Sequence, residues 1–181
     1  ARHGQACPIT RIADLRPRPG RQAAGEKGDM ITIVDGSADD IDGVVAVMDS
    51  AFDPAFGEAW TNSQLRSSLA MSGTRLAVAK YNNETAGFAL VRTIAGETEL
   101  LMIGVHRLYQ KKSIASKLIA KVIEYSIKEH SFIVFLEVRD GNSAHKFYEK
   151  IGFLEIGRRT NYYTGSDGKR FDAITMRLNQ I

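Results

Sequence analysis

Cysteine is almost absent from this sequence, since Cys7 is the only one among 181 residues. An internal disulfide bond and a metal cluster held by several cysteines are therefore excluded. No apolar run approaches the roughly 20 residues that a membrane-spanning helix needs. The N-terminus also lacks the apolar segment of a signal peptide. These absences predict a cytoplasmic protein that does not enter a membrane.

Histidine is also scarce. The four histidines (His3, His106, His130 and His145) are scattered along the chain. No two of them have the spacing of metal ligands on one face of an element, so we expect no bound metal. His106 lies near the candidate site developed below, where it is either a bystander or a second base.

The excess of basic residues is confined to the start of the chain. The net charge is +3, and residues 1–29 hold six lysines and arginines against three acids. The remaining residues hold eighteen of each and are neutral as a group. A pI near 9.0 suggests nucleic-acid binding when the basic residues lie on a domain. Here it reflects only the tail, so no direct nucleic-acid partner is expected.

Residues 1–29 also contain three of the four prolines and show no sustained periodicity. We expect this segment to be a disordered basic tail. Regular patterning begins at Met30, which suggests that Met30 is the natural start. The tail is then upstream read-through or sequence added by cloning, with an Arg-rich targeting peptide as the alternative. Residues 30–181 are expected to form one domain.

Hydrophobic periodicity after Met30 predicts alternating strands and helices. The expected strands are 31–34, 75–81, 86–93, 97–105, 131–138, 154–161 and 172–178. The expected helices carry Ile41, Val44, Val45 and Met48, then residues 62 to about 71, then the stripe Ile114, Leu118, Ile119, Val122, Ile123 and Ile127, and finally residues 144–151. This order predicts an α/β domain with one sheet and helices on its faces.

The segment from Gln110 to Ser116, Gln-Lys-Lys-Ser-Ile-Ala-Ser, joins an expected strand to an expected helix. The first amides of a helix have no partner inside the helix, and the helix dipole adds positive potential there. A strand, a basic turn and a helix therefore suit a bound phosphate. Such turns usually contain glycine, and this one has none. It is either an anion cradle or a solvated loop in which Ser113 caps the helix.

Two further side chains have both a structural and a catalytic interpretation. Glu137 lies in an otherwise apolar strand, where a carboxylate is expensive to bury. It is either paired with Arg139 or another cation, or it is a catalytic base. Tyr148 lies in a short helix and is either part of the core or an acid. A phenol with a pKa near 10 protonates a thiolate, whose acid has a pKa near 8.5, only against a gradient. An acid role for this tyrosine therefore requires a hydrogen bond or a shifted pKa.

Three stretches together resemble one known family. They are "LLMIGVHRLYQKKSIASKLI", "FLEVRDGNSAHKFYEKIGF" and "GRRTNYYTGSDGKRFDAITM". The chain from about Met30 to Leu178 resembles the GCN5-related N-acetyltransferases, or GNAT proteins. Within them it is similar to the RimI type, which acetylates the N-terminal amine of a ribosomal protein. The resemblance implies the GNAT fold, with a central mixed, mostly antiparallel sheet flanked by about four helices.

The resemblance also implies roles for individual residues. Acetyl-CoA is the implied co-substrate, Glu137 the general base acting through water, and Tyr148 the general acid at the departing sulfur. The implied acetyl-CoA contacts are Ile103, Gly104, Val105, Gln110, Lys111, Lys112, Ser113, Ile114, Ala115, Ser116 and Asn142. Gly104 favours this interpretation, because a glycine inside a strand often marks a close approach or a bulge.

The sequence departs from the family pattern in two places. Ser113 replaces the usual first glycine of the turn, which costs little if its φ is negative and more if φ is positive. The spacing from Glu137 to Tyr148 is eleven, one residue shorter than the family pattern, and the shortening falls in the loop before the helix. That loop includes Asn142.

The expected acceptor is a protein N-terminus, in the RimI type the N-terminal alanine of a ribosomal protein. Arg158, Arg159, Tyr162 and Tyr163 either line a groove for that N-terminus or form a basic, aromatic edge strand. Two alternatives stay open: an acetyltransferase for a small amine or lysine, and a degenerate acyl-CoA-binding module without activity. The expected oligomeric state is a monomer or a weak dimer.

Overall fold

The computed structural model describes residues 30–180, so the predictions for residues 1–29 lie outside it. The strands are β1 (Ile31–Asp35), β2 (Thr74–Tyr81), β3 (Glu84–Ile94), β4 (Glu97–Val105), β5 (Ile133–Arg139), β6 (Leu154–Thr164) and β7 (Arg170–Asn179). The helices are α1 (Ile41–Ala51), α2 (Asn62–Leu69), α3 (Ile114–Lys128) and α4 (Ala144–Ile151), with short 3₁₀ turns η2 (Ala38–Asp40), η3 (Pro54–Phe56) and η4 (Arg107–Tyr109).

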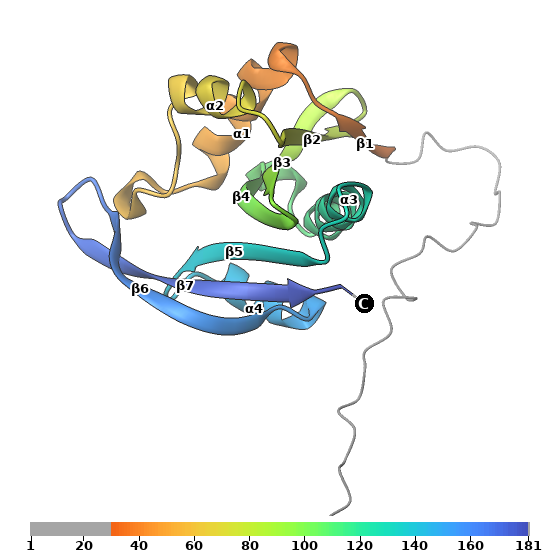
Figure 1. Ribbon diagram of the computed structural model, residues 1–181. Helices are drawn as coiled ribbons and strands as arrows, with labels where there is room; N and C mark the ends of the chain where they lie inside the picture. The colour runs from red at the N-terminus through yellow and green to blue at the C-terminus, as the bar shows by residue number, and fades with distance from the viewer. Residues whose placement is uncertain (1–29, 181) are drawn as a thin grey trace, which may run out of the picture.

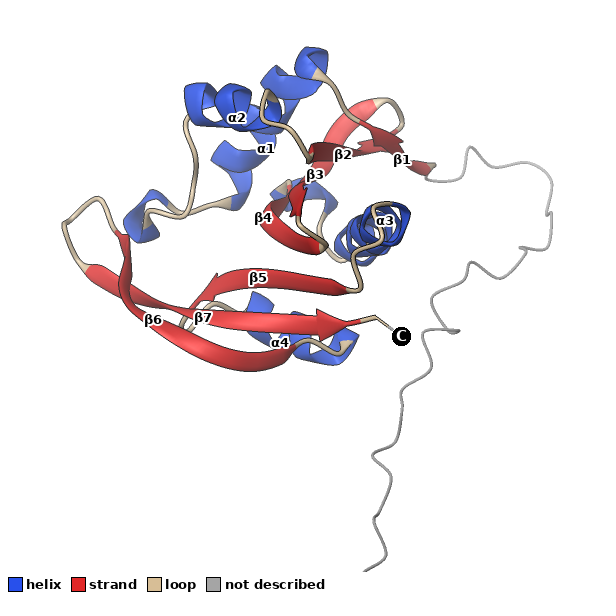
Figure 2. Ribbon diagram, in the orientation of Figure 1, coloured by secondary structure: helices blue, strands red, loops and turns tan. Residues whose placement is uncertain are grey.

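The seven strands form one sheet in the order β1-β2-β3-β4-β5-β7-β6. Every neighbouring pair is antiparallel except β4 and β5, which are parallel. Figure 2 shows the four helices arranged around these strands. The predicted fold class, a mixed and mostly antiparallel sheet flanked by four helices, is therefore confirmed.

Helices cover both faces of the sheet and bury two hydrophobic cores (Figure 1). Helix α1 packs on β3 and β4 over a core that includes Phe88, Leu90 and Met102. Helix α3 packs on β2, β3 and β4 from the other face, and its core continues below β5 and β7 through Tyr148 and Phe153. The apolar stripe of α3 therefore lies where the sequence predicted, against the sheet.

Most predicted boundaries depend on local chemistry and are confirmed. Asn82 and Asn83 both have positive φ and form the two-residue turn between β2 and β3, as a type I′ hairpin requires. The expected strands ended at residue 81 and began again at residue 86, whereas Glu84 already opens β3. Thr61 and Gln64 form a capping box at the start of α2.

Two predictions at the end of α3 were wrong. Ile127 was placed on the buried stripe, but it is 52% exposed because it lies in the last turn of the helix, beyond the sheet. Ser131 was placed in the following strand. Its amide instead donates to the Ser126 carbonyl at 2.8 Å and completes the turn that ends the helix. Strand β5 consequently begins at Ile133.

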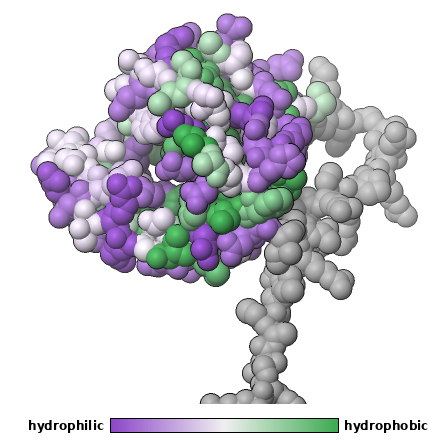
Figure 3. Space-filling view, viewed as in Figure 1, coloured by the Kyte–Doolittle hydropathy of each residue, from purple (hydrophilic) through white to green (hydrophobic). Residues whose placement is uncertain are grey.

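Hydrophilic residues cover much of the molecular face in Figure 3, and hydrophobic residues gather along the lower strands in that view. The large hydrophobic residues that are exposed include Phe132, Leu154 and Ile156. Within residues 30–180, no helix combines the length and hydrophobicity needed to cross a membrane.

The parallel pair β4–β5 positions the site. Only three residue pairs join these strands, from Thr98 with Val134 to Leu100 with Leu136. Beyond Leu100 the ladder ends, although β4 continues to Val105 and β5 to Arg139. A bulge interrupts the β3–β4 register at this same place, where Leu90 pairs with Met102 and Val91 with Leu100. The bulge changes the direction of β4, and the two strands diverge.

Candidate active site

A cavity of about 780 Å³ lies where β4 and β5 diverge. Its walls come from β4, β5, the start of α3, helix α4, the segment between α1 and α2, and the β6 aromatics. The predicted site residues that line it are Ile103, Gly104, Val105, Gln110, Lys111, Ala115, Glu137, Asn142, Tyr148, Tyr162 and Tyr163. Chain topology therefore brings together most of the predicted set.

The unpaired edge of β4 supplies backbone groups to this cavity. The amide of His106 donates to Ala86 on β3 at 2.9 Å. Backbone groups alternate along a strand, so those of Val105 and Ile103 point the other way, into the gap. The Gln110 side chain reaches the Val105 carbonyl from that side, at 3.4 Å.

Glycine is required at position 104 for a different reason from the one that the sequence suggested. A Cβ at this position would lie 2.9 Å from Phe88 and 3.3 Å from Phe52. These contacts lie in the core beneath α1, so the glycine is required by side-chain packing. Gly104 pairs with Phe88 in the β3–β4 ladder.

The turn before α3 leaves the helix N-terminus without a cap. Ser113 has φ +59 and makes no capping bond with its side chain, so the alternative in which Ser113 caps the helix is wrong. The first helical bond runs from Lys117 to the Ser113 carbonyl. The amides of Ile114, Ala115 and Ser116 are therefore the partnerless donors that every helix start presents.

Ser113 has the positive φ that the sequence analysis identified as the less favourable of the two conformations. This conformation costs a non-glycine residue roughly 1–2 kcal/mol. Lys111 also has a positive φ, of +61. The turn thus adopts the backbone shape that glycines usually provide, but builds it from a serine and a lysine.

The two lysines of the turn have different surroundings. Lys111 is exposed and lines the cavity. Lys112 points toward Tyr81, with its Nζ 3.3 Å from the phenol oxygen and 4.9 Å from the ring centre. Lys112 does not line the cavity, and neither do Ser113, Ile114 and Ser116. Ile114 is buried in the core.

Glu137 is the first residue of β5 beyond its last pair with β4. Its neighbours Leu136 and Val138 lie in the core on the α3 side, so Glu137 points to the opposite face. The side chain is only 14% exposed, and its Oε1 accepts a hydrogen bond from Arg159 at 2.8 Å. The sequence predicted pairing with Arg139 or another cation; the partner is another cation, Arg159, while Arg139 pairs with Glu58.

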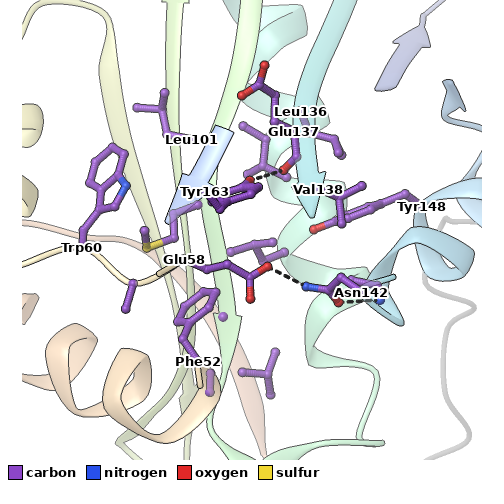
Figure 4. A pocket seen from close by; sticks show the side chains of 18 of the residues that line it. Phe52, Glu58, Trp60, Leu101, Leu136, Glu137, Val138, Asn142, Tyr148 and Tyr163 are labelled. Carbon is purple, nitrogen blue, oxygen red and sulfur yellow. Dashed lines mark hydrogen bonds between the residues drawn. The ribbon is translucent and has the colours of Figure 1, made fainter. Parts of the chain in front are cut away.

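Tyr148 belongs to α4 and is 6% exposed, with its ring against Phe147 and Phe153. Figure 4 shows its hydroxyl directed into the cavity. Burial, with a smaller contribution from the charge of Glu58, raises the pKa of Tyr148. A raised pKa makes full proton transfer from the phenol to a thiolate less favourable. An acid role would require a lowered pKa instead. The raised pKa keeps the phenol protonated at neutral pH, where it can donate a hydrogen bond.

Glu58 is a cavity residue that the sequence gave no reason to select. It precedes α2 in a segment without periodicity, and its Oε1 lies 3.4 Å from Nε of Arg139. Asn142 donates to the same oxygen at 2.9 Å, and its own Oδ1 accepts from the Ala144 amide. Figure 4 shows Glu58 and Asn142 facing each other. The Asn142 side chain, predicted to contact acetyl-CoA, thus connects α4 to the α1–α2 segment.

The segment around Glu58 is held against the β6–β7 hairpin. The Arg139 guanidinium lies 3.7 Å from the centre of the Phe56 ring. Gly57 approaches so closely that an added Cβ would lie 2.0 Å from the Thr164 carbonyl oxygen. These contacts close one end of the cavity.

The four predicted acceptor residues divide into two groups. Tyr162 and Tyr163 line the cavity, because a register shift and the positive φ of Asn161 bend β6 between Arg159 and Tyr163. The Tyr163 hydroxyl lies 3.5 Å from the Glu137 carbonyl oxygen. Arg159 does not line the cavity but donates a hydrogen bond to Glu137, which does. Arg158 pairs with Asp140 at 2.5 Å and Asp172 at 3.3 Å, outside the cavity.

The arrangement has the parts that transfer of an acyl group to an amine requires. A carboxylate and a phenol face one cavity, exposed strand backbone lies beside them, and an uncapped helix N-terminus with a lysine stands at the end of that strand. The opened sheet and these groups fit the class of acyltransferases.

Comparison with known proteins gives the family. A model described as the acetyltransferase (GNAT) family matches residues 45–153, and the chain belongs to this family. A ribosomal protein bS18-alanine N-acetyltransferase of Haemophilus influenzae is 40% identical over 96 residues, which are 52% of this chain and 65% of that protein. The enzyme of the same name from Haemophilus ducreyi is 31% identical over 120 residues, 66% of this chain and 82% of that protein.

Solved structures agree with this assignment. The crystal structure of the ribosomal-protein-S18-alanine N-acetyltransferase from Escherichia coli superposes with a TM-score of 0.75 at 29% identity. The match covers 84% of this chain and 96% of that one. The predicted resemblance to GNAT proteins, and within them to the RimI type, is therefore confirmed.

Proposed function

We propose that this protein transfers an acetyl group from acetyl-CoA to the α-amine at the N-terminus of a protein, in the cytoplasm. A ribosomal protein beginning with alanine is the proposed acceptor, by similarity to the bS18-alanine acetyltransferases. The observation that carries the proposal is that Glu137 and Tyr148 line the same cavity as the unpaired edge of β4 and the start of α3.

Acetyl-CoA supplies an activated thioester and an anionic diphosphate, and the residues present suit both parts. The amides of Ile114, Ala115 and Ser116, with the charge of Lys111, would bind the diphosphate. The Val105 and Ile103 backbone, which faces the gap, would hold the arm that carries the acetyl group. Holding both reactants in one cavity lowers the barrier by several kcal/mol.

Glu137 is the proposed base. It takes one proton from the acceptor ammonium through water, and the neutral amine forms a C–N bond as the C–S bond breaks. The second proton, which the nitrogen loses as the amide forms, protonates the departing thiolate. An α-amine titrates near pH 8 and a lysine near 10.4. A carboxylate therefore removes a proton more readily from an N-terminal ammonium than from a lysine. Tyr148, kept protonated by its burial, donates a hydrogen bond to the departing sulfur.

The direct test is mass spectrometry of peptides incubated with the full chain and acetyl-CoA. A peptide that begins with alanine should gain 42 Da at its α-amine, as the acetyl group requires, and the same peptide with a formylated N-terminus and an internal lysine should not. Acetylation of the lysine or of a small amine alone would favour the second enzyme hypothesis.

The non-enzymatic alternative is tested by Glu137→Gln. Loss of a general base should lower kcat by about 10²–10⁴-fold, while calorimetry should find acetyl-CoA affinity within about threefold of the wild type. Acetyl-CoA binding with no turnover in the wild-type protein would support the degenerate binding module instead.

A further inference from the structure

A second hollow of about 380 Å³ adjoins the active-site cavity. It is lined by Arg92, Ile94, Glu97, Thr98, Glu99 and Phe135. Glu99 also lines the larger cavity, so the two hollows share one side chain. Leu100 and Leu136 lie in the core on the α3 side. Glu99 and Glu137 therefore share the opposite face of the sheet.

Glu99 lies close to Glu137, the proposed base, on the neighbouring strand. It pairs with Phe135, two residues before Glu137 on β5. A strand spacing of ~4.8 Å and a rise of ~3.3 Å per residue place the Cα atoms of Glu99 and Glu137 about 8 Å apart. An extended acceptor with its amine at Glu137 would thus bring its second or third side chain to Glu99.

The Glu99 carboxylate has no hydrogen bond or ion pair with any residue between 30 and 180. Arg92 is its neighbour across the β3–β4 ladder, yet no ion pair forms between them. Burial and the negative charge of Glu137 raise the pKa of Glu99, and Arg92 and Arg159 act in the opposite direction. Arg159 is already engaged by Glu137. The surroundings therefore favour a further cation at this point.

We propose that Glu99 is a specificity-determining residue that binds a lysine or arginine side chain at the second or third position of the acceptor. This inference rests on the proposed function, because it requires a peptide whose α-amine lies at Glu137. The second hollow would receive the apolar part of that side chain against Phe135 and Ile94.

The test compares kcat/KM for three peptides that begin with alanine and carry arginine, glutamine or glutamate at positions two and three. The full-length wild type should prefer the arginine peptide over the glutamine one by about fivefold or more. Glu99→Gln should reduce this ratio to near one. Glu99→Lys should favour the glutamate peptide.

Asp49→Asn is the matched control. Asp49 is an exposed carboxylate on α1 outside both hollows, so its loss changes net charge equally and should keep the wild-type preference. An unchanged preference in Glu99→Gln, with or without a lower melting temperature, would overturn the inference. Acetylation of the glutamine peptide separately tests the proposed function, and a wild type that acetylates no peptide would overturn both.

Discussion

Arg159 donates a hydrogen bond to Glu137 at 2.8 Å, so the proposed base is ion-paired before any acceptor arrives. The arginine is 58% exposed and its guanidinium carbon lies 4.3 Å from the centre of the Tyr162 ring. The carboxylate in turn raises the pKa of Arg159. This hydrogen bond holds the Glu137 carboxylate in one position, and correct position is the first requirement of a general base.

Replacing Arg159 should therefore lower the activity. In Arg159→Ala the Glu137 carboxylate loses the hydrogen bond that positions it, so the proposed base is held less well. The value of kcat/KM for a peptide that begins with alanine should fall by about tenfold. Arg158→Ala is the control, since Arg158 pairs with Asp140 and Asp172 instead. Equal losses of kcat/KM in both variants would argue against a specific role for Arg159.

Tyr148→Phe should lower kcat by about 10²-fold, because it removes the donor proposed for the departing sulfur. Burial raises the pKa of this phenol, so the hydroxyl does not titrate between pH 7 and 9. The wild-type and variant rate profiles should therefore have the same shape over that range. A variant that changes the alkaline limb below pH 9 would contradict this assignment.

The same burial predicts how stability depends on alkaline pH. The unfolded phenol ionises near pH 10, whereas the folded one stays protonated to higher pH. The stabilising contribution is complete below about pH 10 and is lost as the pH rises toward the folded-state pKa. In Tyr148→Phe the free energy of unfolding should fall less steeply above pH 10, by about 1.4 kcal/mol per pH unit. Urea denaturation between pH 9 and 11.5 measures this slope.

The two lysines of the turn should contribute unequally to acetyl-CoA binding. Lys111 lines the cavity, whereas Lys112 points toward Tyr81. Calorimetry on Lys111→Ala should give an affinity lower by about three- to tenfold, a difference that shrinks as salt is raised. Lys112→Ala should bind within about twofold of the wild type. The reverse order would place the diphosphate on the other side of the turn.

Ser113→Gly should stabilise the protein. The serine has φ +59, and glycine adopts this conformation without the roughly 1 kcal/mol of strain that another residue carries. Greater freedom of the unfolded glycine offsets part of the gain. The expected increase in unfolding free energy is about 0.5 kcal/mol. Ser116→Gly, in regular helix, should instead destabilise by a similar amount, and thermal denaturation distinguishes the two.

Features that depend on local chemistry were predictable from the sequence. The Asn82–Asn83 turn and the capping box at Thr61 depend on residues close together in the chain. The family motifs also located Glu137 and Tyr148, which the structure places in one cavity.

Features that depend on distant contacts were not predictable. The sign of φ at Ser113 was open, because serine permits either value at different cost. Glu58 gave no signal, since its position depends on Arg139 and the β6–β7 hairpin, far away in sequence. The sequence left the Glu137 partner open between Arg139 and another cation, because Arg159 lies on β6, which β7 separates from β5 in the sheet.

The three-pair junction of β4 and β5 has a consequence for how the molecule unfolds. So short a junction provides few hydrogen bonds to couple β1–β4 with β5–β7, so the two blocks should open locally at different free energies. A ligand lying between them would act as an added cross-link. Acetyl-CoA should therefore slow amide exchange in both blocks, including strands it does not touch.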